Sequence, residues 1–394
     1  MRIGIFGGTF NPPHNGHVTI ARAAVTQLGL DKLLIVPACV PPHKPLPSGV
    51  TAGQRYDMAA LMAAPVGRCA EASDMELHRT GKSYTSDTLV QLQQEYPDAE
   101  LWLLMGSDMF LSLHTWHEPE TICRIARIAA FRRVEEDIRA AMERQKQRLE
   151  RQYQAQVTLL ENPELIELSS TDVRAALAEG QGSGLVPAAV WGYIQREHLY
   201  GTSTDLKHLT PDALRPIAMS YLKPKRMAHV LGTEATAVKL AKQYGADETE
   251  ARVAALLHDC TKKLDMDQQL ALCRQYGLEL DELEQQALKL LHSRTGAAIA
   301  RDVFGVNDAV YSAIRFHTTG KPHMTLLEKI LYLADYMEPT RDFDGVEQLR
   351  DLAKTDLDAA LLRGFEMSLE LLQQRGKAID PNSRAARDYL LRKE

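Results

Sequence analysis

Short apolar runs alternate with amphipathic stretches through the first half of the chain. The apolar runs have strand character and lie at Ile3–Phe6, Lys32–Pro37, Leu101–Met105, Ile128–Phe131 and Val157–Leu160. Helical periodicity separates them, at Val18–Gly29, Ala52–Ala64 and Thr85–Tyr96 among other segments. Strands separated by helices predict an α/β domain, in which a parallel sheet carries helices on both faces. A ligand of such a sheet binds beyond the carboxyl ends of the strands.

The second half has helical periodicity and almost no strand signal. Apolar positions recur at helical spacing in Thr233–Tyr244, Glu248–Leu257 and Leu326–Tyr336. The small, polar stretch Leu199–Asp205 precedes this region and predicts a linker. A chain of 394 residues exceeds the usual size of one core. We therefore expect a domain over 1–200, a linker over 201–211 and an all-α domain over 212–394.

Composition and charge narrow the class of protein. The chain is 45% hydrophobic and 25% charged, which is ordinary for a globular protein. Its net charge of −6 argues against a nucleic-acid partner, and no apolar run approaches the roughly 20 residues that span a membrane. The first residues lead directly into a strand instead of a signal peptide. Five cysteines without a C-x-x-C pair predict reduced thiols in a cytoplasmic protein.

The turn after the first strand has the features of a phosphate site. It reads GGTFNPPHNGH, where Gly7 and Gly8 allow close approach of the backbone to a ligand and Asn15 is a candidate helix N-cap. The helix would direct free N–H groups at an anion. His14 and His17 are three residues apart, so both rings can face one anion near the helix start. A glycine turn with two surface histidines is the plainer interpretation of the same residues.

A second set of phosphate-binding groups lies late in the first half. The hydroxyls of Ser169, Ser170 and Thr171 come just before a helical run, and Arg174 lies one turn into it. Helix N-terminal donors with a guanidinium suit a phosphate group. Lys44, in a proline-rich loop after the second strand, is also placed to reach a phosphate, although such a lysine is usually only solvated.

Further candidate residues follow the strand Leu101–Met105. Gly106-Ser107-Asp108 lies directly at its carboxyl end. Trp116 lies in a polar loop between two histidines, where an indole is poorly placed for burial. We expect this ring to stack on a flat heterocycle, with packing into the core as the alternative.

These motifs together resemble a known family. The first turn is similar to the G-x-F-x-P-x-H-x-G-H motif of nucleotidyltransferases, and LSSTDVR at 168–174 resembles their I-S-S-T-x-x-R motif. With the segments PHK at 42–44, SYTSDT at 83–88, GSD at 106–108 and TWH at 115–117, residues 1 to about 200 resemble bacterial nicotinate-mononucleotide adenylyltransferases. The resemblance implies a Rossmann-like fold that uses ATP with Mg²⁺ and nicotinate mononucleotide. It implies deamido-NAD and pyrophosphate as products.

The resemblance also implies roles for individual residues. The catalytic set would be His14, His17, Lys44 and Arg174. The ATP-binding set would be Gly7, Gly8, Thr9, Phe10, His14, His17, Gly106, Asp108, Ser169, Ser170, Thr171 and Arg174. Lys44, Thr85 and Trp116 would bind the mononucleotide.

In the second half, buried acids and imidazoles indicate a metal site. His258-Asp259 ends the apolar run Val253–Leu257, and Asp335 lies in another apolar helix. A buried carboxylate needs a partner, and a metal ion at the helix edge could take both His258 and Asp259. With His229 this H…HD…D series resembles the HD phosphohydrolase superfamily. A lone histidine of this kind is more often an ordinary core or surface residue.

The resemblance to HD proteins extends the ligand set and suggests a substrate. HD proteins with two metals carry extra ligands where this chain has His292 and His317, which favours a binuclear site containing iron. The full metal set is then His229, His258, Asp259, His292, His317 and Asp335, with Asp259 also catalytic. The strings FHTTG at 316–320 and LLEKILYLADYMEP at 326–339 are similar to bacterial HD hydrolases that split diadenosine tetraphosphate symmetrically into two ADP. Arg294 lies in a segment that fits less tightly.

The resemblance leaves several questions about the second half. Lys262, Lys263, Lys321 and Arg341 are candidate phosphate contacts, although each could be a solvated charge. The mixed ligands would also suit Mn, Ni, Zn or Mg. The second half could hydrolyse another nucleotide phosphoester, or it could be a sensing module without turnover. The resemblance further suggests a homodimer.

Overall fold

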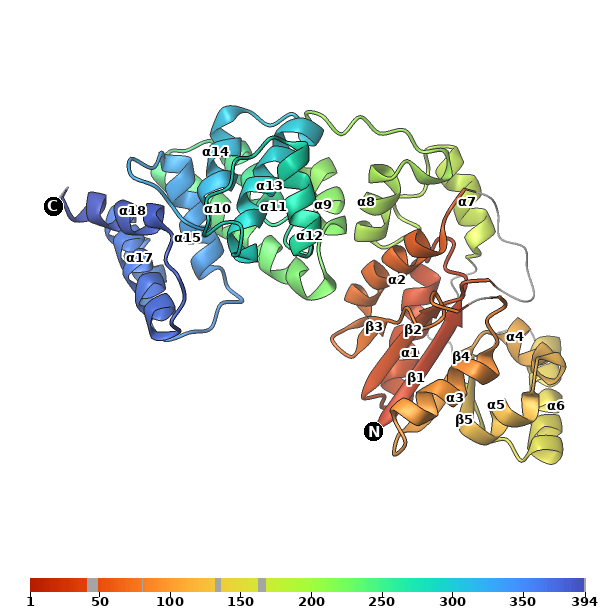
Figure 1. Ribbon diagram of the computed structural model, residues 1–394. Helices are drawn as coiled ribbons and strands as arrows, with labels where there is room; N and C mark the ends of the chain where they lie inside the picture. The colour runs from red at the N-terminus through yellow and green to blue at the C-terminus, as the bar shows by residue number, and fades with distance from the viewer. Residues whose placement is uncertain (41–48, 80, 132–135, 162–167, 393–394) are drawn as a thin grey trace. The chain divides into compact units, whose positions relative to one another are not determined.

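The chain forms two compact units, Met1–Ser203 and Thr204–Glu394 (Figure 1). The computed structural model describes residues 1–40, 49–79, 81–131, 136–161 and 168–392. None of the helices within these ranges combines the length and the apolar character that crossing a bilayer requires. The boundary between the units falls in a short irregular segment between a 3₁₀ turn, η2 (Leu199–Gly201), and helix α9 (Pro211–Ser220).

The first unit is built on a six-stranded sheet in the order β3-β2-β1-β4-β5-β6. All neighbouring strands are parallel. The strands are β1 Arg2–Gly8, β2 Lys32–Pro37, β3 Ala70–Ala72, β4 Glu100–Met105, β5 Ala126–Phe131 and β6 Val157–Leu160. The predicted parallel sheet is therefore confirmed, and β3 is a strand that the apolar pattern does not predict.

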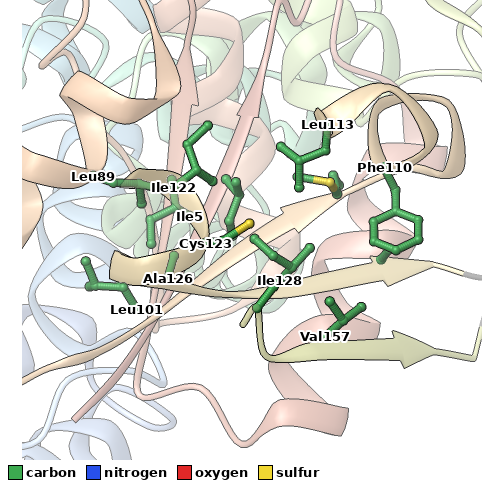
Figure 2. Packing of buried hydrophobic residues seen from close by; sticks show 14 of the residues in the cluster. Ile5, Leu89, Leu101, Phe110, Leu113, Ile122, Cys123, Ala126, Ile128 and Val157 are labelled. Atoms are coloured by element: carbon green, nitrogen blue, oxygen red, sulfur yellow. The ribbon is translucent and has the colours of Figure 1, made fainter. Parts of the chain in front are cut away.

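The first unit has eight helices in its described residues, and those that pack on the sheet form two groups. They are α1 Asn15–Leu28, α2 Ala52–Val66, α3 Thr85–Glu95, α4 Ser107–Ser112, α5 Pro119–Ile125, α6 Glu136–Tyr153, α7 Ser170–Ala178 and α8 Ala188–Arg196, with a 3₁₀ turn, η1, at Leu113–Thr115. Helices α1 and α2 pack against each other and against β1 and β2. Helices α3 to α6 supply side chains to a separate core that includes residues of β1, β4 and β5 (Figure 2).

The alternation of side chains along β1 explains how two faces are filled. Ile3 and Ile5 are fully buried in the core shown in Figure 2. Between them, a Cβ at Gly4 would lie 2.5 Å from Leu30 Cδ1 and 2.9 Å from Leu33 Cδ1. Successive residues of a strand point to opposite faces, so Gly4 marks the face on which the chain packs too closely for a side chain.

The strand order reverses between β1 and β4. From β1 the chain proceeds outward to β2 and β3, and it then returns to place β4 on the other side of β1. At such a reversal the loops after the two strands diverge to opposite faces and leave a crevice at the carboxyl ends. The loops that begin at Gly8 and at Met105 therefore define the expected binding position.

The second unit consists of helices alone in its described residues. They are α9 Pro211–Ser220, α10 Pro224–Tyr244, α11 Glu248–Leu257, α12 Met266–Gln275, α13 Leu288–Phe304, α14 Asp308–Phe316, α15 Leu326–Met337, α16 Val346–Leu352, α17 Leu357–Gln374 and α18 Pro381–Leu391. The predicted all-α architecture is confirmed.

Local signals fix the central helices of this unit. Helix α10 begins with Pro224 in its first turn and ends at Gly245, whose φ of 75° lies in the left-handed region. Thr325 caps α15 by accepting a hydrogen bond from the Glu328 N–H. Helix α10 packs against α11 and α15, and α14 packs against α11, α13 and α15. These contacts bring together distant parts of the sequence.

Candidate functional site

The first candidate site begins where β1 gives way to α1. Gly7 and Gly8 are the last residues of β1, and α1 starts at Asn15 with His14 as its N-cap. The prediction of Asn15 as the N-cap is wrong by one residue, since its side chain instead donates to the Gly184 carbonyl at 2.8 Å. A Cβ at Gly8 would lie 3.1 Å from Phe10 Cζ, whereas one at Gly7 would meet nothing within 4 Å. The backbone at Gly7 therefore borders open space.

The rings of His14 and His17 are in contact at the start of α1, with their planes tilted by 37°. Their ring centroids are 3.7 Å apart, and the His14 N–H donates to His17 Nδ1 at 3.1 Å. Because Nδ1 is an acceptor, the neutral His17 ring carries its proton on Nε2. Burial lowers the pKa of His14 to about 4, and burial followed by the neighbouring His14 lowers the pKa of His17 well below its usual range. At neutral pH both rings are uncharged, and His17 is a donor through Nε2.

The second motif meets the first motif in space. Ser169 caps α7, and its Oγ accepts from the Asp172 N–H at 3.2 Å. Ser170 Oγ donates to the Pro12 carbonyl at 3.0 Å, and Arg174 Nη1 donates to the Asn11 carbonyl at 2.7 Å. The structure therefore brings both motifs to one position at the carboxyl end of β1.

The remaining nucleotide candidates border the same edge of the sheet. Gly106 is the N-cap of α4, directly after β4, and Asp108 is exposed in the first turn of that helix. Since β4 pairs with β1, these residues lie across the strand-order reversal from the His14–His17 pair. Lys44 belongs to the segment 41–48, which is outside the described residues.

The residues predicted to hold the nicotinate ring have different surroundings. Thr85 is the first residue of α3. Trp116 is partly buried against the core of the first unit, and its Nε1–H donates to Ser112 Oγ at 3.3 Å. His117 of the TWH segment lies over the ring of Tyr84, the residue before Thr85, with centroids 4.3 Å apart. The sequence motifs include both residues but do not predict this contact.

A hydrogen bond from the end of the first unit also reaches the turn between β1 and α1, residues 9–14, which is called the nucleotide turn below. Tyr200 donates its hydroxyl proton to Asn11 Oδ1 at 2.5 Å. Asn11 is 2% exposed, and its Nδ2 has no hydrogen-bond partner among the described residues. Tyr200 itself has a φ of 56°, which is uncommon for a residue with a side chain. The Asn11 amide is therefore fixed with its donor group unused.

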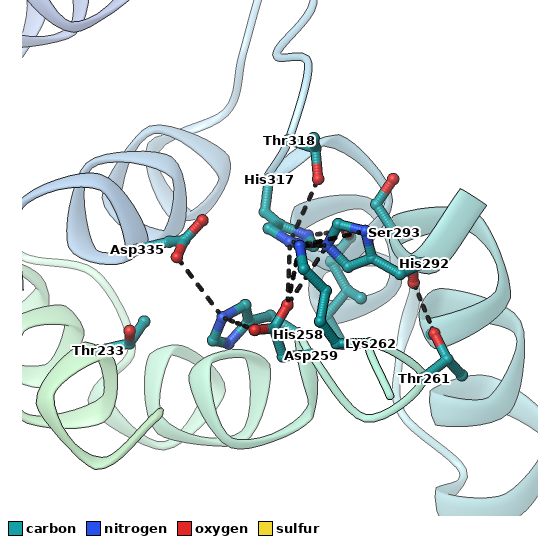
Figure 3. A network of polar contacts seen from close by, with 12 residues as sticks. Thr233, His258, Asp259, Thr261, Lys262, His292, Ser293, His317, Thr318 and Asp335 are labelled. Carbon is teal, nitrogen blue, oxygen red and sulfur yellow. Dashed lines mark hydrogen bonds and ion pairs between the residues drawn. The ribbon is translucent and has the colours of Figure 1, made fainter. Parts of the chain in front are cut away.

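The second candidate site gathers six side chains from five helical segments, and Figure 3 shows those of His258, Asp259, His292, His317 and Asp335. They are His229 of α10, His258 and Asp259 after α11, His292 of α13, His317 after α14 and Asp335 of α15. All the imidazoles are at most 5% exposed. These six are the residues that the sequence predicts as metal ligands, and two overlapping groups of them have the spacing of a cation site: His229, His258 and Asp335, and His258, Asp259 and His317.

Asp259 lies between two pairs of imidazoles. Its Oδ2 is 3.6 Å from His258 Nε2 and 4.0 Å from His229 Nε2. Its Oδ1 is 3.3 Å from His292 Nε2 and 3.9 Å from His317 Nε2. The two oxygens therefore face different parts of the cluster, and Oδ1 makes no hydrogen bond to a described residue although it is buried.

The hydrogen bonds on the far side of the rings decide which nitrogen faces the cluster. His229 Nδ1 lies 3.0 Å from Glu338 Oε1, His258 Nδ1 lies 2.6 Å from the Ala255 carbonyl, and His317 Nδ1 lies 2.7 Å from the Ile314 carbonyl. Each of these oxygens accepts, so each neutral ring carries its proton on Nδ1. The Nε2 lone pairs then point inward.

These inward lone pairs fit a cation. The Nε2 atoms of His229 and His258 are 3.4 Å apart, although both are acceptors. Acceptors at that distance repel each other unless a positive group lies near them, and imidazole with carboxylate is a common ligand set for transition metals. The donor chemistry of the six residues therefore fits the predicted metal site.

The charges around the cluster follow from its burial. Burial raises the pKa of Asp259, but His258, His292 and Lys262 outweigh that effect and hold the pKa well below its usual range. Burial likewise raises the pKa of Asp335, but its contacts with His229, whose Nε2 is 2.9 Å from Oδ1, and with His258 outweigh that effect and hold the pKa well below its usual range. Both carboxylates are therefore ionised, and they supply the negative charge of the site.

Two partly exposed guanidinium groups contact these carboxylates. Arg226 Nε donates to Asp259 Oδ2 at 2.5 Å, and Arg341 Nη2 donates to Asp335 Oδ1 at 2.9 Å. Arg341 is one of the predicted phosphate contacts. Arg226 was missed, although it lies three residues before His229 on one helical face, and that spacing could have identified it. Glu338 was missed as well, although it follows Asp335 by three residues.

The predicted lysines differ in their contacts. Lys262 Nζ lies 2.8 Å from His292 Nε2 and 3.7 Å from Asp259 Oδ1, so it borders the cluster. Lys263 is partly buried beside it. Lys321 Nζ instead pairs with the buried Glu328 at 2.8 Å and lies over the Phe316 ring. The contacts of Lys321 are therefore with Glu328 and Phe316, which are not among the six candidate ligands.

Comparison with known proteins agrees with this division. The cytidylyltransferase-like family model matches residues 5–176, and the HD domain model matches residues 226–340. The fold and the two sites thus define a chain with a cytidylyltransferase-like α/β unit followed by an HD domain. A probable nicotinate-nucleotide adenylyltransferase of Neisseria meningitidis serogroup C is 39% identical over 201 residues, which are 50% of this chain and 98% of the relative.

Two further relatives match the second half. The symmetrical bis(5′-nucleosyl)-tetraphosphatase of Halalkalibacterium halodurans is 41% identical over 177 residues, which are 43% of this chain and 91% of the relative. The crystal structure of a predicted HD superfamily hydrolase involved in NAD metabolism from Clostridium acetobutylicum is 41% identical, with a TM-score of 0.46 over 47% of this chain and 99% of that chain. The chain belongs to the nicotinate-nucleotide adenylyltransferase family through its first half and to the symmetrical bis(5′-nucleosyl)-tetraphosphatase family through its second half.

Proposed function

We propose that this chain is a bifunctional cytoplasmic enzyme. Its first unit transfers AMP from ATP, supplied with Mg²⁺, to nicotinate mononucleotide, and its second unit hydrolyses diadenosine tetraphosphate to two ADP at a site for two metal ions, with iron as the preferred metal. The hydrogen bond from Arg174 of the second motif to the Asn11 carbonyl of the first motif supports the first activity. The position of Asp259 between two imidazole pairs supports the second activity.

In the first unit the reaction is a displacement at the α-phosphorus of ATP. A 5′-phosphate oxygen of the mononucleotide forms the new P–O bond, while the bond to the bridging oxygen breaks and pyrophosphate leaves. The protein contributes positioning and charge stabilisation. His17 would donate its Nε2–H to a phosphate oxygen, and the His14 ring beside it would line the same path. Ser170, Thr171 and Arg174 would hold the leaving phosphates at the N-terminus of α7.

The experiment for the first unit is a product assay with purified full-length protein. Incubation with ATP and nicotinate mononucleotide is expected to yield deamido-NAD and pyrophosphate in equal amounts. A parallel incubation with nicotinamide mononucleotide measures the preference for the acid. Absence of any dinucleotide product from either mononucleotide would refute the adenylyltransferase proposal.

In the second unit the six inward-facing ligands would hold the two ions. Such ions lower the pKa of a water molecule and neutralise phosphoryl charge. Arg226, Lys262 and Arg341 border the carboxylates and would bind the tetraphosphate chain. Glu338 would keep the His229 ring oriented by accepting its Nδ1–H. The buried Asp259 carboxylate and the partly buried Asp335 carboxylate keep the site anionic, so it favours cations before substrate arrives.

The experiment for the second unit is chromatography of the products from diadenosine tetraphosphate. Iron-loaded wild-type protein is expected to give ADP alone. The His258→Ala variant is expected to lose both bound metal and hydrolysis while it retains adenylyl transfer. Wild-type hydrolysis in that variant would refute the metal site. Hydrolysis of another nucleotide phosphoester instead would change the substrate, and metal binding without turnover would indicate a sensing module.

A further inference from the structure

Arg55 is a fully buried cation beneath the nucleotide turn. It lies near the start of α2, and its side chain is 0% exposed. Nη1 donates to the Thr9 carbonyl at 2.9 Å and to the Ala38 carbonyl at 2.6 Å. Nη2 donates to the Cys39 carbonyl at 3.0 Å. The guanidinium thus donates hydrogen bonds to three backbone carbonyl oxygens.

These oxygens belong to the loops that leave two neighbouring strands. Thr9 follows β1, whereas Ala38 and Cys39 follow β2, which pairs with β1 in parallel. One guanidinium therefore joins both loops at the edge of the sheet where a ligand binds. Its planar fork supplies several donors in fixed directions, which a lysine ammonium cannot reproduce.

The contact with Thr9 determines how the next peptide N–H points. In a trans peptide the carbonyl and the following N–H point in opposite directions. Since the Thr9 carbonyl points to Arg55, the Phe10 N–H points away from it. Phe10 has a φ of 48°, which is uncommon for a residue with a side chain and must be held by its surroundings. Arg55 holds the carbonyl before Phe10, and Arg174 holds the carbonyl of Asn11 after it.

The charge of Arg55 lacks a protein counter-ion in the described part of the chain. No carboxylate of these residues forms an ion pair with it, and its Nε has no hydrogen-bond partner among them. Burial is the main influence on the guanidinium and lowers its pKa. The nearby Cys39 and Tyr200 raise the pKa, but by less than burial lowers it. A buried charge without a counter-ion is unfavourable even when it is hydrogen-bonded, so an anion bound at the turn that Arg55 supports would be stabilised by this charge.

We propose that Arg55 is a positioning residue for adenylyl transfer, which fixes the Thr9–Phe10 peptide with its N–H toward the nucleotide phosphates and whose buried charge those phosphates balance. The proposal rests on the proposed function of the first unit. It gives Arg55 two separable contributions, an electrostatic one to nucleotide affinity and a geometric one to turnover.

The test uses the full chain with Arg55→Lys, Arg55→Met and the control Arg22→Met. Arg22 also donates to a carbonyl, that of Pro65 at 2.6 Å, but it is exposed and lies on α1 away from the turn. Calorimetry measures binding of the non-hydrolysable analogue α,β-methylene-ATP with Mg²⁺, and steady-state assays give kcat and KM. Thermal unfolding with and without the analogue gives the shift in Tm that binding produces.

Arg55→Lys keeps the charge and loses the fork, so we expect kcat about 10-fold lower with the KM for ATP within about 3-fold of wild type. Arg55→Met loses the charge as well, so the analogue should bind at least about 10-fold more weakly and its Tm shift should shrink. Arg22→Met should match wild type in all three measurements.

Several outcomes would overturn the inference. One is an Arg55→Met variant with a lower Tm alone but an undiminished shift with the analogue, because that result assigns Arg55 a structural role only. If Arg55→Met does not fold, Arg55→Lys decides, and wild-type kcat in that variant contradicts the proposal. If the wild-type protein does not bind the analogue, the proposed function of the first unit is refuted. That result differs from one in which the wild-type protein binds the analogue and only the role of Arg55 is refuted.

Discussion

Arg174 donates a hydrogen bond to the main-chain carbonyl of Asn11 at 2.7 Å, across 163 residues of sequence. Its other terminal nitrogen donates to Thr171 Oγ1 at 3.1 Å. The same guanidinium therefore fixes the turn after β1 and the N-terminus of α7. Together with the hydrogen bond from Ser170 to the Pro12 carbonyl, this side chain sets the relative position of the groups that an anion bound between the two segments would meet.

Replacement of Arg174 should impair adenylyl transfer more than folding. Arg174→Ala removes both the link to Asn11 and a cation at the leaving phosphates, so we expect kcat/KM to fall about 100-fold or more. Arg151→Ala, an exposed arginine on α6, serves as the control and should retain wild-type kinetics. A loss of less than about 3-fold in Arg174→Ala would contradict the role given to this residue.

His17→Ala should lower turnover by about two or more orders of magnitude, in the range seen when a transition-state donor is removed. The reason is the fixed tautomer, in which Nδ1 accepts from the His14 N–H and leaves Nε2–H as the donor. His78→Ala is the matched control, because the His78 side chain is 76% exposed. Single-turnover kinetics separate the chemical step from binding, and full activity in His17→Ala would refute the site.

The stability of the first unit should depend on pH through His14. Its pKa is about 4 in the folded chain, against 6.5 as the ordinary value. The unfolded chain therefore binds more protons below pH 6.5, so this contribution to stability is present above that pH and is lost as the pH falls toward 4.

Urea unfolding of wild type and His14→Gln at pH 7 and pH 5 tests this dependence. The loss of unfolding free energy between the two pH values should be about 2 kcal/mol smaller in His14→Gln. His78→Gln should leave the wild-type dependence unchanged, because its ring is exposed. Equal pH dependence in wild type and His14→Gln would show that His14 is not buried in a neutral form.

Metal content should respond in steps to the loss of individual imidazoles. His292→Ala leaves His229, His258 and Asp335 intact, so we expect the content to fall from about two ions per chain to about one. His258→Ala affects both groups of ligands, so the content should approach zero. Elemental analysis of the purified proteins measures this, with His323→Ala as an exposed control in the same unit. A single ion in the wild type would contradict the binuclear proposal.

Glu338→Gln should weaken metal binding without removing a ligand. The Glu338 carboxylate is 0% exposed and accepts the His229 Nδ1–H, so it fixes the ring and raises the basicity of Nε2. We expect metal affinity to fall about 10- to 100-fold, as judged by competition with a chelator. Glu347→Gln, at an exposed carboxylate, should behave as wild type. Unchanged affinity in Glu338→Gln would mean that the ring needs no such support.

The strength of local signals decides which parts of the fold could be predicted. The strand Lys32–Pro37 carries a continuous apolar run, and α11 matches the predicted Glu248–Leu257. The strand Ala70–Ala72 has the sequence Ala-Glu-Ala, which has no strand character, and it forms because the edge of β2 offers hydrogen-bond partners. Helix α10 starts at Pro224, nine residues before the predicted Thr233. Proline is favoured in the first turn of a helix, so Pro224 indicates this earlier start.

The residues of the candidate sites likewise fall into those that the sequence predicts and those that it does not. The motif residues could be predicted because their types and spacing carry the chemistry, and the structure gathers the six candidate ligands. Arg55 and Tyr200 could not be predicted, because the Thr9 and Asn11 groups that they contact lie 46 and 189 residues away and their roles depend on which carbonyl or amide they meet. The position of Trp116 could not be predicted from the polar residues around it, because the loop is polar and the indole nevertheless packs against the core.

The two candidate sites draw their described side chains from separate units, with the nucleotide turn within Met1–Ser203 and the six-residue cluster within Thr204–Glu394. In genetic terms, this one chain should behave as two cistrons. A cell that carries one copy with His17→Ala and a second copy with His258→Ala should have both activities, because each copy supplies the site that the other lacks. Such intragenic complementation is expected only where no catalytic centre is shared between the halves of the chain.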